Sequence, residues 1–118
     1  MTQLELKIES RDGVVLMAFS GELDLAEAAR VEQRLLEIEA ARPPLVVLDL
    51  RGLTFIDSSG LRLVIEADQR ARRDDRRMAL VRGPEQVRRI FAIALLDTRL
   101  QMVEDPAELS AAGDGAPP

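Results

Sequence analysis

Residues 45–61, LVVLDLRGLTFIDSSGL, form the stretch of sequence that decides the fold. Its first part, Leu45 to Leu50, is a short and continuous apolar run rich in leucine and β-branched valine. Such a run is typical of a strand that is buried on both faces and has helices packed on either side of its sheet. After Arg51 to Ile56 comes the sequence DSSG, and from Leu61 onward the pattern becomes helical. A buried strand followed closely by a helix indicates an α/β protein.

The segment before this stretch predicts two strands joined as a hairpin. Apolar and charged residues alternate from Leu4 to Glu9, which is the pattern of a half-buried strand. Arg11 to Gly13 supplies the residues of a tight turn, and Val14 to Phe19 is a second run rich in apolar residues. Gly21 ends this second strand. We therefore expect an antiparallel pair at the start of the chain.

A helix is expected between the hairpin and the buried strand. Asp24 can cap its first turn, and Glu27, three residues later, gives the spacing of a capping box. Apolar residues recur on one face of this segment, and Pro43-Pro44 stops the helix. The face expected to be buried contains Ala28, Val31, Leu35 and Ile38.

The rest of the chain repeats the alternation of helix and strand. The helix that follows the serines is expected to bury an apolar side. Arg77 to Arg82 predicts a fourth strand, and Pro84 is expected at the first position of a third helix. Leu100 to Val103 indicates a last strand, and Asp105-Pro106 starts a short helix. The apolar side of the second helix contains Leu61, Val64, Ile65 and Ala71.

The resulting order is β-β-α-β-α-β-α-β-α, which predicts one α/β domain over residues 1–110 and a flexible tail over residues 111–118. Strands that alternate with helices form a mainly parallel sheet with helices packed on it, and the hairpin makes this sheet mixed. Functional loops of such sheets lie beyond the carboxyl ends of the strands. Two loops meet this rule, namely Gly21 to Asp24 and Asp57 to Gly60.

The composition argues against several classes of function. The 118 residues are 47% hydrophobic and 3% aromatic, and the formal net charge is −5. An acidic chain without tyrosine or tryptophan lacks the basic groove and the stacked rings that bind nucleic acid directly. The chain has no cysteine, its first ten residues lack the basic and apolar stretches expected of a targeting segment, and no apolar stretch is long enough to cross a membrane. We therefore expect a cytoplasmic protein without a nucleic acid or membrane partner.

The serines of DSSG raise the question of catalysis. A catalytic serine needs a base, but the chain has no histidine, and its one lysine is expected on the first strand. No glycine-rich phosphate-binding motif occurs, and Asp49 lies inside its apolar run rather than at a strand end, where a receiver domain is phosphorylated. Asp24 and Asp57 could hold Mg²⁺ if their loops were neighbours, although such residues more often cap helices. We therefore expect no enzyme, no cofactor and no bound metal.

Two interpretations of DSSG remain open from the residues alone. In the first, Asp57 or Ser58 is only a helix cap, whose removal costs about 1 kcal/mol, and Gly60 permits a tight turn. In the second, a serine hydroxyl is itself the substrate of a kinase. A phosphate adds about −1.5 to −2 charges, and the dipole at a helix start tolerates such an anion. Phosphorylation would then change binding rather than folding.

Four segments of the chain together resemble the STAS domain family, in particular the bacterial anti-sigma factor antagonists. They are GELD at residues 21–24, LVVLDL at 45–50, LTFIDSSGL at 53–61 and GPEQVRRIF at 83–91. The resemblance implies a small α/β domain that binds an anti-sigma factor serine kinase and so releases a sigma factor for transcription. The kinase phosphorylates a serine of the motif and breaks the complex, and a phosphatase restores it.

The same resemblance implies roles for single residues. The phosphoacceptor corresponds to Ser58, with Ser59 as the second choice. The environment of the phosphosite comprises Asp24, Asp57, Ser59 and Gly60. The partner is expected to contact Glu22, Asp24, Ser58, Arg62, Leu63 and Glu66. An alternative keeps the fold without the switch, as an accessory or scaffold STAS subunit of a transporter or of a stress-signalling complex.

Two positions depart from the family pattern. Arg62 stands where a small residue often follows the serine motif, so the partner surface is expected to differ chemically. The segment Phe91 to Leu95 lacks the glycine often found near the end of the third helix. We expect the turn after that helix to be built differently.

Overall fold

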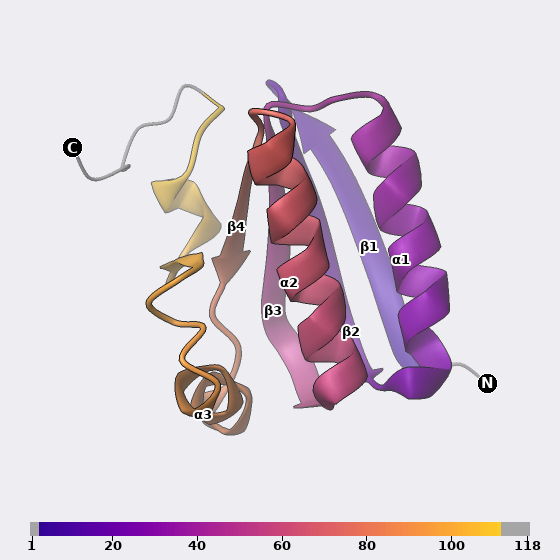
Figure 1. Cartoon of the computed structure of the whole chain (residues 1–118), viewed down its shortest axis with the longest axis vertical. Coiled ribbons are helices and arrows are strands. Elements are labelled where there is room, and N and C mark those ends of the chain that lie inside the picture. Colours follow the sequence, from indigo (N-terminus) through magenta and orange to yellow (C-terminus); the bar gives the residue numbers. More distant parts are fainter. Residues whose placement is uncertain (1–2, 112–118) are drawn as a thin grey trace.

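The computed structural model describes residues 3–111 and shows one sheet with helices packed on it (Figure 1). The five strands lie in the order β1-β2-β3-β4-β5; β1 and β2 are antiparallel, and all other neighbours are parallel. The mixed, mainly parallel α/β sheet predicted from the sequence is therefore confirmed. The elements are β1 (Leu4–Arg11), β2 (Val14–Leu23), α1 (Leu25–Ala40), β3 (Leu45–Ile56), α2 (Ser58–Arg73), β4 (Arg77–Val81), α3 (Glu85–Ile93), β5 (Gln101–Val103) and the 3-10 helix η1 (Pro106–Glu108).

The predicted tail falls almost entirely outside this description, because residues 112–118 are not among the described residues. Within residues 3–111, no helix combines the length and the apolar composition that crossing a membrane requires.

The turn between β1 and β2 has the two-residue geometry that Asp-Gly favours. Asp12 and Gly13 both have positive φ, 53° and 81°, and Arg11 pairs directly with Val14 across the turn. Two successive positive φ angles define the hairpin turn that matches the twist of the flanking strands. The hairpin is therefore confirmed, together with the turn residues that the sequence indicated.

Strand β3 is longer than the sequence indicated. The run Leu45 to Leu50 is entirely buried, as expected, but the strand continues to Ile56. Its second half pairs only with β2, and the register shifts twice there, once between Ala18 and Ser20. A Cβ added at Gly52 would lie 2.6 Å from the Phe19 carbonyl oxygen, so this residue must be small where the two strands approach. Exposed Arg51 and Gly52 interrupt the apolar pattern and hide this half from sequence analysis.

The first half of β3 separates two layers of apolar side chains. All three α-helices contribute to the main core, and α1 and α2 lie side by side on the same face of the sheet (Figure 1). The other face carries a smaller cluster that includes Leu45 and Val47, and it is covered by Leu109 from the C-terminal segment. The run is thus buried on both faces as predicted, although Leu109, which covers one face, lies outside the helices.

The helix starts agree with the sequence except in detail. The Asp24 carboxylate accepts a hydrogen bond of 3.3 Å from the Glu27 backbone N–H at the start of α1. The Glu27 side chain accepts from the Arg30 guanidinium at 2.7 Å, instead of accepting from the Asp24 backbone N–H as in a capping box. Helix α3 begins at Glu85, with Pro84 as its cap residue, so the proline lies one position earlier than expected.

The turn after α3 adopts the left-handed conformation that glycine favours, with a leucine at that position. Leu95 has a φ of 60°, and its N–H donates to the Ala92 carbonyl at 3.0 Å. The Leu96 N–H donates to the Phe91 carbonyl at 2.9 Å, which completes a Schellman motif. The Leu95 side chain is 67% exposed.

Candidate functional site

The two loops singled out by the sequence meet at the lower end of the molecule in Figure 1, where β2 and β3 end and α1 and α2 begin. Leu23 at the end of β2 pairs with Ile56 at the end of β3. The Asp57 N–H also donates to the Leu23 carbonyl at 3.2 Å. Loops 21–24 and 57–60 are therefore neighbours, which the sequence alone had left open.

The Asp57 carboxylate holds the starts of both helices. Its Oδ1 accepts from the backbone N–H groups of Ser59 at 2.9 Å and Gly60 at 3.1 Å, which is the predicted cap of α2. Its Oδ2 accepts from the N–H of Leu25, the first residue of α1, at 3.1 Å. A negative charge is favourable at each helix start, because unpaired N–H groups and the helix dipole converge there. This single side chain therefore links the start of α1 to the start of α2.

Gly60 is required by close packing and not by a turn. It is buried within the first turn of α2. A Cβ at this position would lie 2.6 Å from Cγ1 of Ile56 and 2.9 Å from Cγ of Leu23. The sequence-based interpretation, in which this glycine permits a tight turn, is therefore wrong. Glycine lets the start of α2 rest directly on the ends of β2 and β3.

The two serines differ in their surroundings. Ser58, the first residue of α2, is exposed, and no hydrogen bond within residues 3–111 involves its hydroxyl. Ser59 is half-buried and lines a groove between α1 and α2. Ser58 is therefore the hydroxyl that another protein can reach more easily.

Most of the α2 residues that were predicted to contact a partner line a groove between α1 and α2. Its lining residues are Leu25, Ala28, Ala29, Glu32, Ser59, Arg62, Leu63 and Glu66. Arg62 is exposed and forms no ion pair within the described part of the chain. Leu63 is only 3% exposed and packs in the core, so it offers a partner little surface. Glu22 is exposed near the end of β2, where it pairs with Phe55 of β3.

Two exposed apolar residues at this end were missed by the sequence analysis. Leu25 is 74% exposed at the start of α1, and Phe55 is 45% exposed near the end of β3. Leu25 lies three residues before Ala28, which is the spacing of the buried face. The sequence pattern therefore gave no sign that its side chain is exposed. Phe55 lies in the half of β3 that was not recognised as strand.

Asp49, the residue considered for a receiver domain, belongs to a different part of the sheet. It is buried within β3 and accepts from the Arg51 guanidinium at 3.0 and 2.7 Å. Burial by itself would raise the pKa of Asp49, but the hydrogen bonds and charge of Arg51 outweigh it and hold the pKa below its ordinary value. The carboxylate is thus occupied as a structural ion pair.

Asp24 and Asp57 are both engaged in capping, although their loops are adjacent. Residues 3–111 contain no group of three or more histidine, cysteine, aspartate or glutamate side chains that could hold a metal ion. The geometry described here is therefore that of two joined helix starts beside a groove.

The chain belongs to the STAS domain family, whose pattern it matches over residues 5–109. The family and the fold expected from the four sequence segments are both confirmed by this match and by the sheet order.

Particular relatives carry names that bear on function. The anti-sigma-F factor antagonist RsfB of Mycobacterium tuberculosis is 28% identical over 67 residues, which cover 57% of this chain and 55% of RsfB. The match thus spans about half the length of that relative. An anti-sigma factor antagonist from Mycobacterium paratuberculosis has a similar fold, with a TM-score of 0.81, 24% identity and 89% of each chain covered. The phosphorylated form of the Bacillus cell fate determinant SpoIIAA gives a TM-score of 0.69 at 19% identity, covering 87% of this chain and 95% of SpoIIAA.

Proposed function

We propose that this chain is a cytoplasmic anti-sigma factor antagonist that is switched by phosphorylation of Ser58. It binds an anti-sigma factor serine kinase through the end of the molecule where α1 and α2 begin. The kinase phosphorylates Ser58 and thereby weakens the complex, and a phosphatase restores it. The chain acts as a binding protein and substrate, not as an enzyme. The observation that carries the proposal is an exposed hydroxyl at the first position of α2, beside a groove, in a STAS domain.

The names of the relatives support this proposal. RsfB is an anti-sigma-F factor antagonist, and SpoIIAA is an anti-sigma factor antagonist that has been solved in both unphosphorylated and phosphorylated forms. The chemistry of the site is consistent with these names, since the hydroxyl of Ser58 is accessible. The chain contains no histidine or cysteine that could act as a base and activate this hydroxyl.

The fold can tolerate a phosphate at Ser58 because the hydrogen bonds of the site do not use its hydroxyl. The Asp57 carboxylate already satisfies the N–H groups of Ser59 and Gly60, so the cap of α2 is complete before modification. A dianion at the first helical position is also stabilised by the dipole of α2. The added charge lies beside Asp57 and changes the surface rather than the core.

The unphosphorylated surface combines apolar anchors with charged side chains. Leu25 and Phe55 are the exposed apolar residues at this end of the sheet. Arg62 and Glu66 line the groove on α2, and Glu22 lies on the neighbouring strand end. Apolar anchors with a charged rim are the usual composition of a protein interface. We therefore assign partner contacts to these residues and to Asp24, and we leave out buried Leu63.

The test is a pull-down from the source cell with and without ATP, followed by mass spectrometry of the tryptic peptide that contains residues 52–62. We expect recovery of a kinase in the absence of ATP, and loss of that kinase as phosphate appears on Ser58. Ser58→Ala should bind the kinase in both conditions and should not be phosphorylated. Ser59→Ala is the matched control, because it removes the neighbouring hydroxyl and should leave the phosphorylation intact.

Two outcomes would contradict the proposal. Phosphorylation of Ser58→Ala at the wild-type level would move the acceptor to Ser59. Stable co-purification with a multisubunit complex that ATP does not affect would favour an accessory or scaffold role, in which Ser58 is only the first residue of a capped helix.

A further inference from the structure

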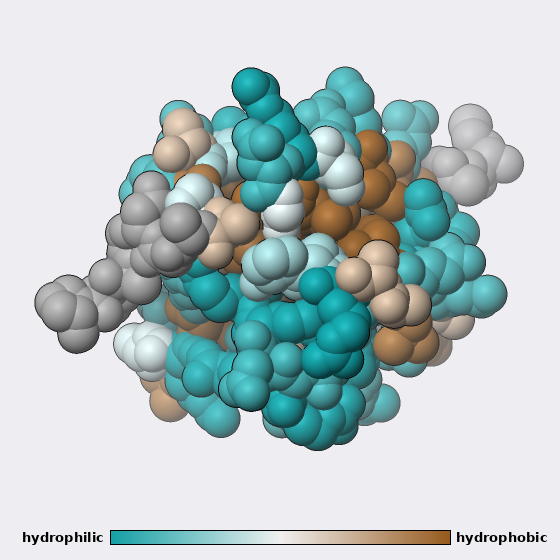
Figure 2. Space-filling view, turned by 90° about the horizontal axis from the view of Figure 1, so that it is seen from above, coloured by the Kyte–Doolittle hydropathy of each residue, from teal (hydrophilic) through white to brown (hydrophobic). Residues whose placement is uncertain are grey.

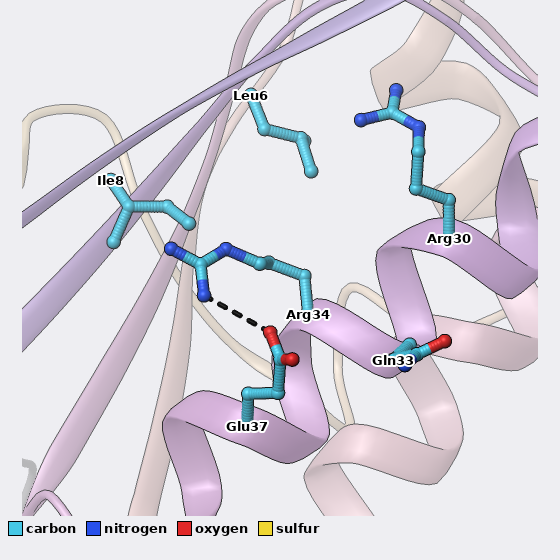
Figure 3. A pocket seen from close by; sticks show the side chains of 6 residues that line it. All are labelled: Leu6, Ile8, Arg30, Gln33, Arg34 and Glu37. Atoms are coloured by element: carbon cyan, nitrogen blue, oxygen red, sulfur yellow. Dashed lines mark hydrogen bonds and ion pairs between the residues drawn. The ribbon is translucent and has the colours of Figure 1, made fainter.

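Strand β1 is one edge of the sheet, and within residues 3–111 no other strand covers its outer side. It spans eight residues, Leu4–Arg11, and pairs only with β2. A groove of about 570 Å³ runs beside it, between the strand and α1. Figure 3 shows Leu6 and Ile8 of β1 on one side of this groove and Arg30, Gln33, Arg34 and Glu37 of α1 on the other. An open edge of this length is a template for pairing with another strand.

The hydrogen bonds of β1 show which residues present free backbone groups. The Glu22 N–H donates to the Gln3 carbonyl at 2.9 Å, so odd-numbered residues of this strand bond toward β2. Even-numbered residues therefore point their N–H and C=O groups outward. The Leu4 carbonyl confirms this direction, because it accepts from the Arg30 guanidinium at 2.7 Å on the open side. Leu6, Ile8 and Ser10 remain to pair with an added strand.

The sequence of β1 is complementary to itself in one antiparallel register. Ile8 then lies opposite Ile8 of a second copy, and Leu6 lies opposite Ser10, so the outward backbone groups face one another. The charged residues of the other face pair with opposite sign, Lys7 with Glu9 and Glu5 with Arg11. Opposite charges directly across a sheet stabilise it, and like charges destabilise it.

Neighbouring registers are less favourable for identifiable reasons. Centring the pair on Lys7 brings lysine against lysine and Glu5 against Glu9. Centring it on Glu9 brings glutamate against glutamate and Lys7 against Arg11. Centring it on Leu6 would pair Glu5 with Lys7, but it also needs the Leu4 carbonyl, which the Arg30 guanidinium occupies. The register centred on Ile8 is therefore selected by charge and by hydrogen bonding together.

We propose that two copies of this chain associate through antiparallel pairing of β1, centred on Ile8, to form a continuous ten-stranded sheet across a twofold axis. The pairing buries Leu6 and Ile8 of both copies between the two α1 helices. The surface lies on the β1 edge and not at the ends of β2 and β3, so a dimer leaves Ser58 and the groove between α1 and α2 accessible. This inference does not depend on the proposed function.

The first test measures the oligomeric state by sedimentation over a range of protein concentrations. We expect a reversible dimer. Lys7→Glu and Glu9→Lys should each weaken it by about tenfold, because each creates two like-charged pairs across the axis. The double variant Lys7→Glu/Glu9→Lys restores opposite signs and should dimerise like the wild type. Both side chains are exposed in the single chain, 80% and 62%, so these variants should fold normally.

The second test uses the absence of cysteine from the sequence to determine the register. Lys7→Cys and Glu9→Cys proteins, mixed under mild oxidation, should form a disulfide-linked dimer faster than either variant alone. Fast cross-linking of Lys7→Cys alone would contradict the register. A wild-type protein that stays monomeric at every concentration would overturn the proposal, as would a dimer that the single charge reversals do not weaken. Dimerisation of Ser58→Ala should equal that of the wild type, which separates this result from the phosphorylation experiment.

Discussion

Helices α1 and α2 lie side by side, and they are joined differently at their two ends. Where they begin, the Asp57 carboxylate accepts backbone N–H groups from both helices. Where they end, the Arg70 guanidinium donates two hydrogen bonds to the Glu39 carboxylate, at 2.7 and 2.9 Å. Figure 2 looks onto this second end, where hydrophilic residues cover most of the surface around a smaller hydrophobic area.

The difference supports the proposal that a partner binds at the first end. Backbone N–H groups satisfy the Asp57 carboxylate, and the side chains of Ser58 and Arg62 beside it stay exposed. At the other end, Glu39 and Arg70 neutralise each other with only 10% and 18% of their side chains exposed. Charged side chains that are already paired and mostly buried are costly to separate and offer little for recognition.

The largest effect is expected from breaking the ion pair between Glu39 and Arg70 at the second end. Glu39→Gln should lower the free energy of unfolding by about 3 kcal/mol, because it leaves the mostly buried Arg70 without a counter-charge. Urea denaturation measures this loss. Glu37→Gln is the matched control, since its pair with Arg34 is about half exposed. The control should change stability by less than about 0.5 kcal/mol. Equal losses in the two variants would contradict the contrast between the ends.

Gly60→Ala tests the close packing at the first end. Alanine favours a helix over glycine by up to about 1 kcal/mol, so propensity alone predicts stabilisation. The added methyl group would instead contact Ile56 and Leu23, and we expect a net loss of about 2 kcal/mol. Thermal unfolding measures the sign directly. A gain in stability would show that the ends of β2 and β3 can shift easily to accommodate the methyl group.

Asp57→Ala compares the two caps of the first end. It removes three backbone hydrogen bonds and should cost about 1.5 kcal/mol, near the upper part of the range for a helix cap. Asp24→Ala removes one bond and should cost less. Chemical denaturation of both variants measures the difference. Equal costs would mean that the additional bonds accepted by Asp57, including the one donated by the Leu25 N–H, contribute nothing to stability.

The pH dependence of stability tests the role of Asp49, a carboxylate that belongs to neither end. Because Asp49 has a pKa below its ordinary value of 3.8 in the folded protein, its ionised form adds stability above that value. This contribution should be lost as the pH falls from the ordinary value through the lower, folded pKa. Unfolding free energies of Asp49→Asn and wild type, measured from about pH 5 to about pH 2, should therefore converge. A constant difference over that range would contradict the role of Arg51.

Local patterns predicted most of the fold and part of the site. Asp24 and Asp57 could be recognised as caps because the donors lie within three residues along the chain. The hairpin turn and the strand Leu45 to Leu50 were likewise encoded in consecutive residues. The extension of β3 to Ile56 was not, since it depends on pairing with β2 through register shifts.

The parts of the site that could not be predicted depend on contacts distant in sequence. The bond between Leu25 and Asp57 joins residues 32 positions apart, and the pair of Arg70 with Glu39 spans 31. The reason for Gly60 lies in the ends of two strands, and the burial of Leu63 depends on packing against the core. Sequence periodicity reports which side of a helix is apolar and not what covers it.

The stability of the protein can be improved at Leu95, a position remote from Asp57. Its left-handed backbone costs an L-residue about 1 kcal/mol that glycine does not pay, and its side chain gains little from burial because it is mostly exposed. Leu95→Gly should therefore raise the melting temperature without altering the first turn of α2. Such a variant would supply a tolerant background, in which costly substitutions around the serines could be studied in a protein that still folds.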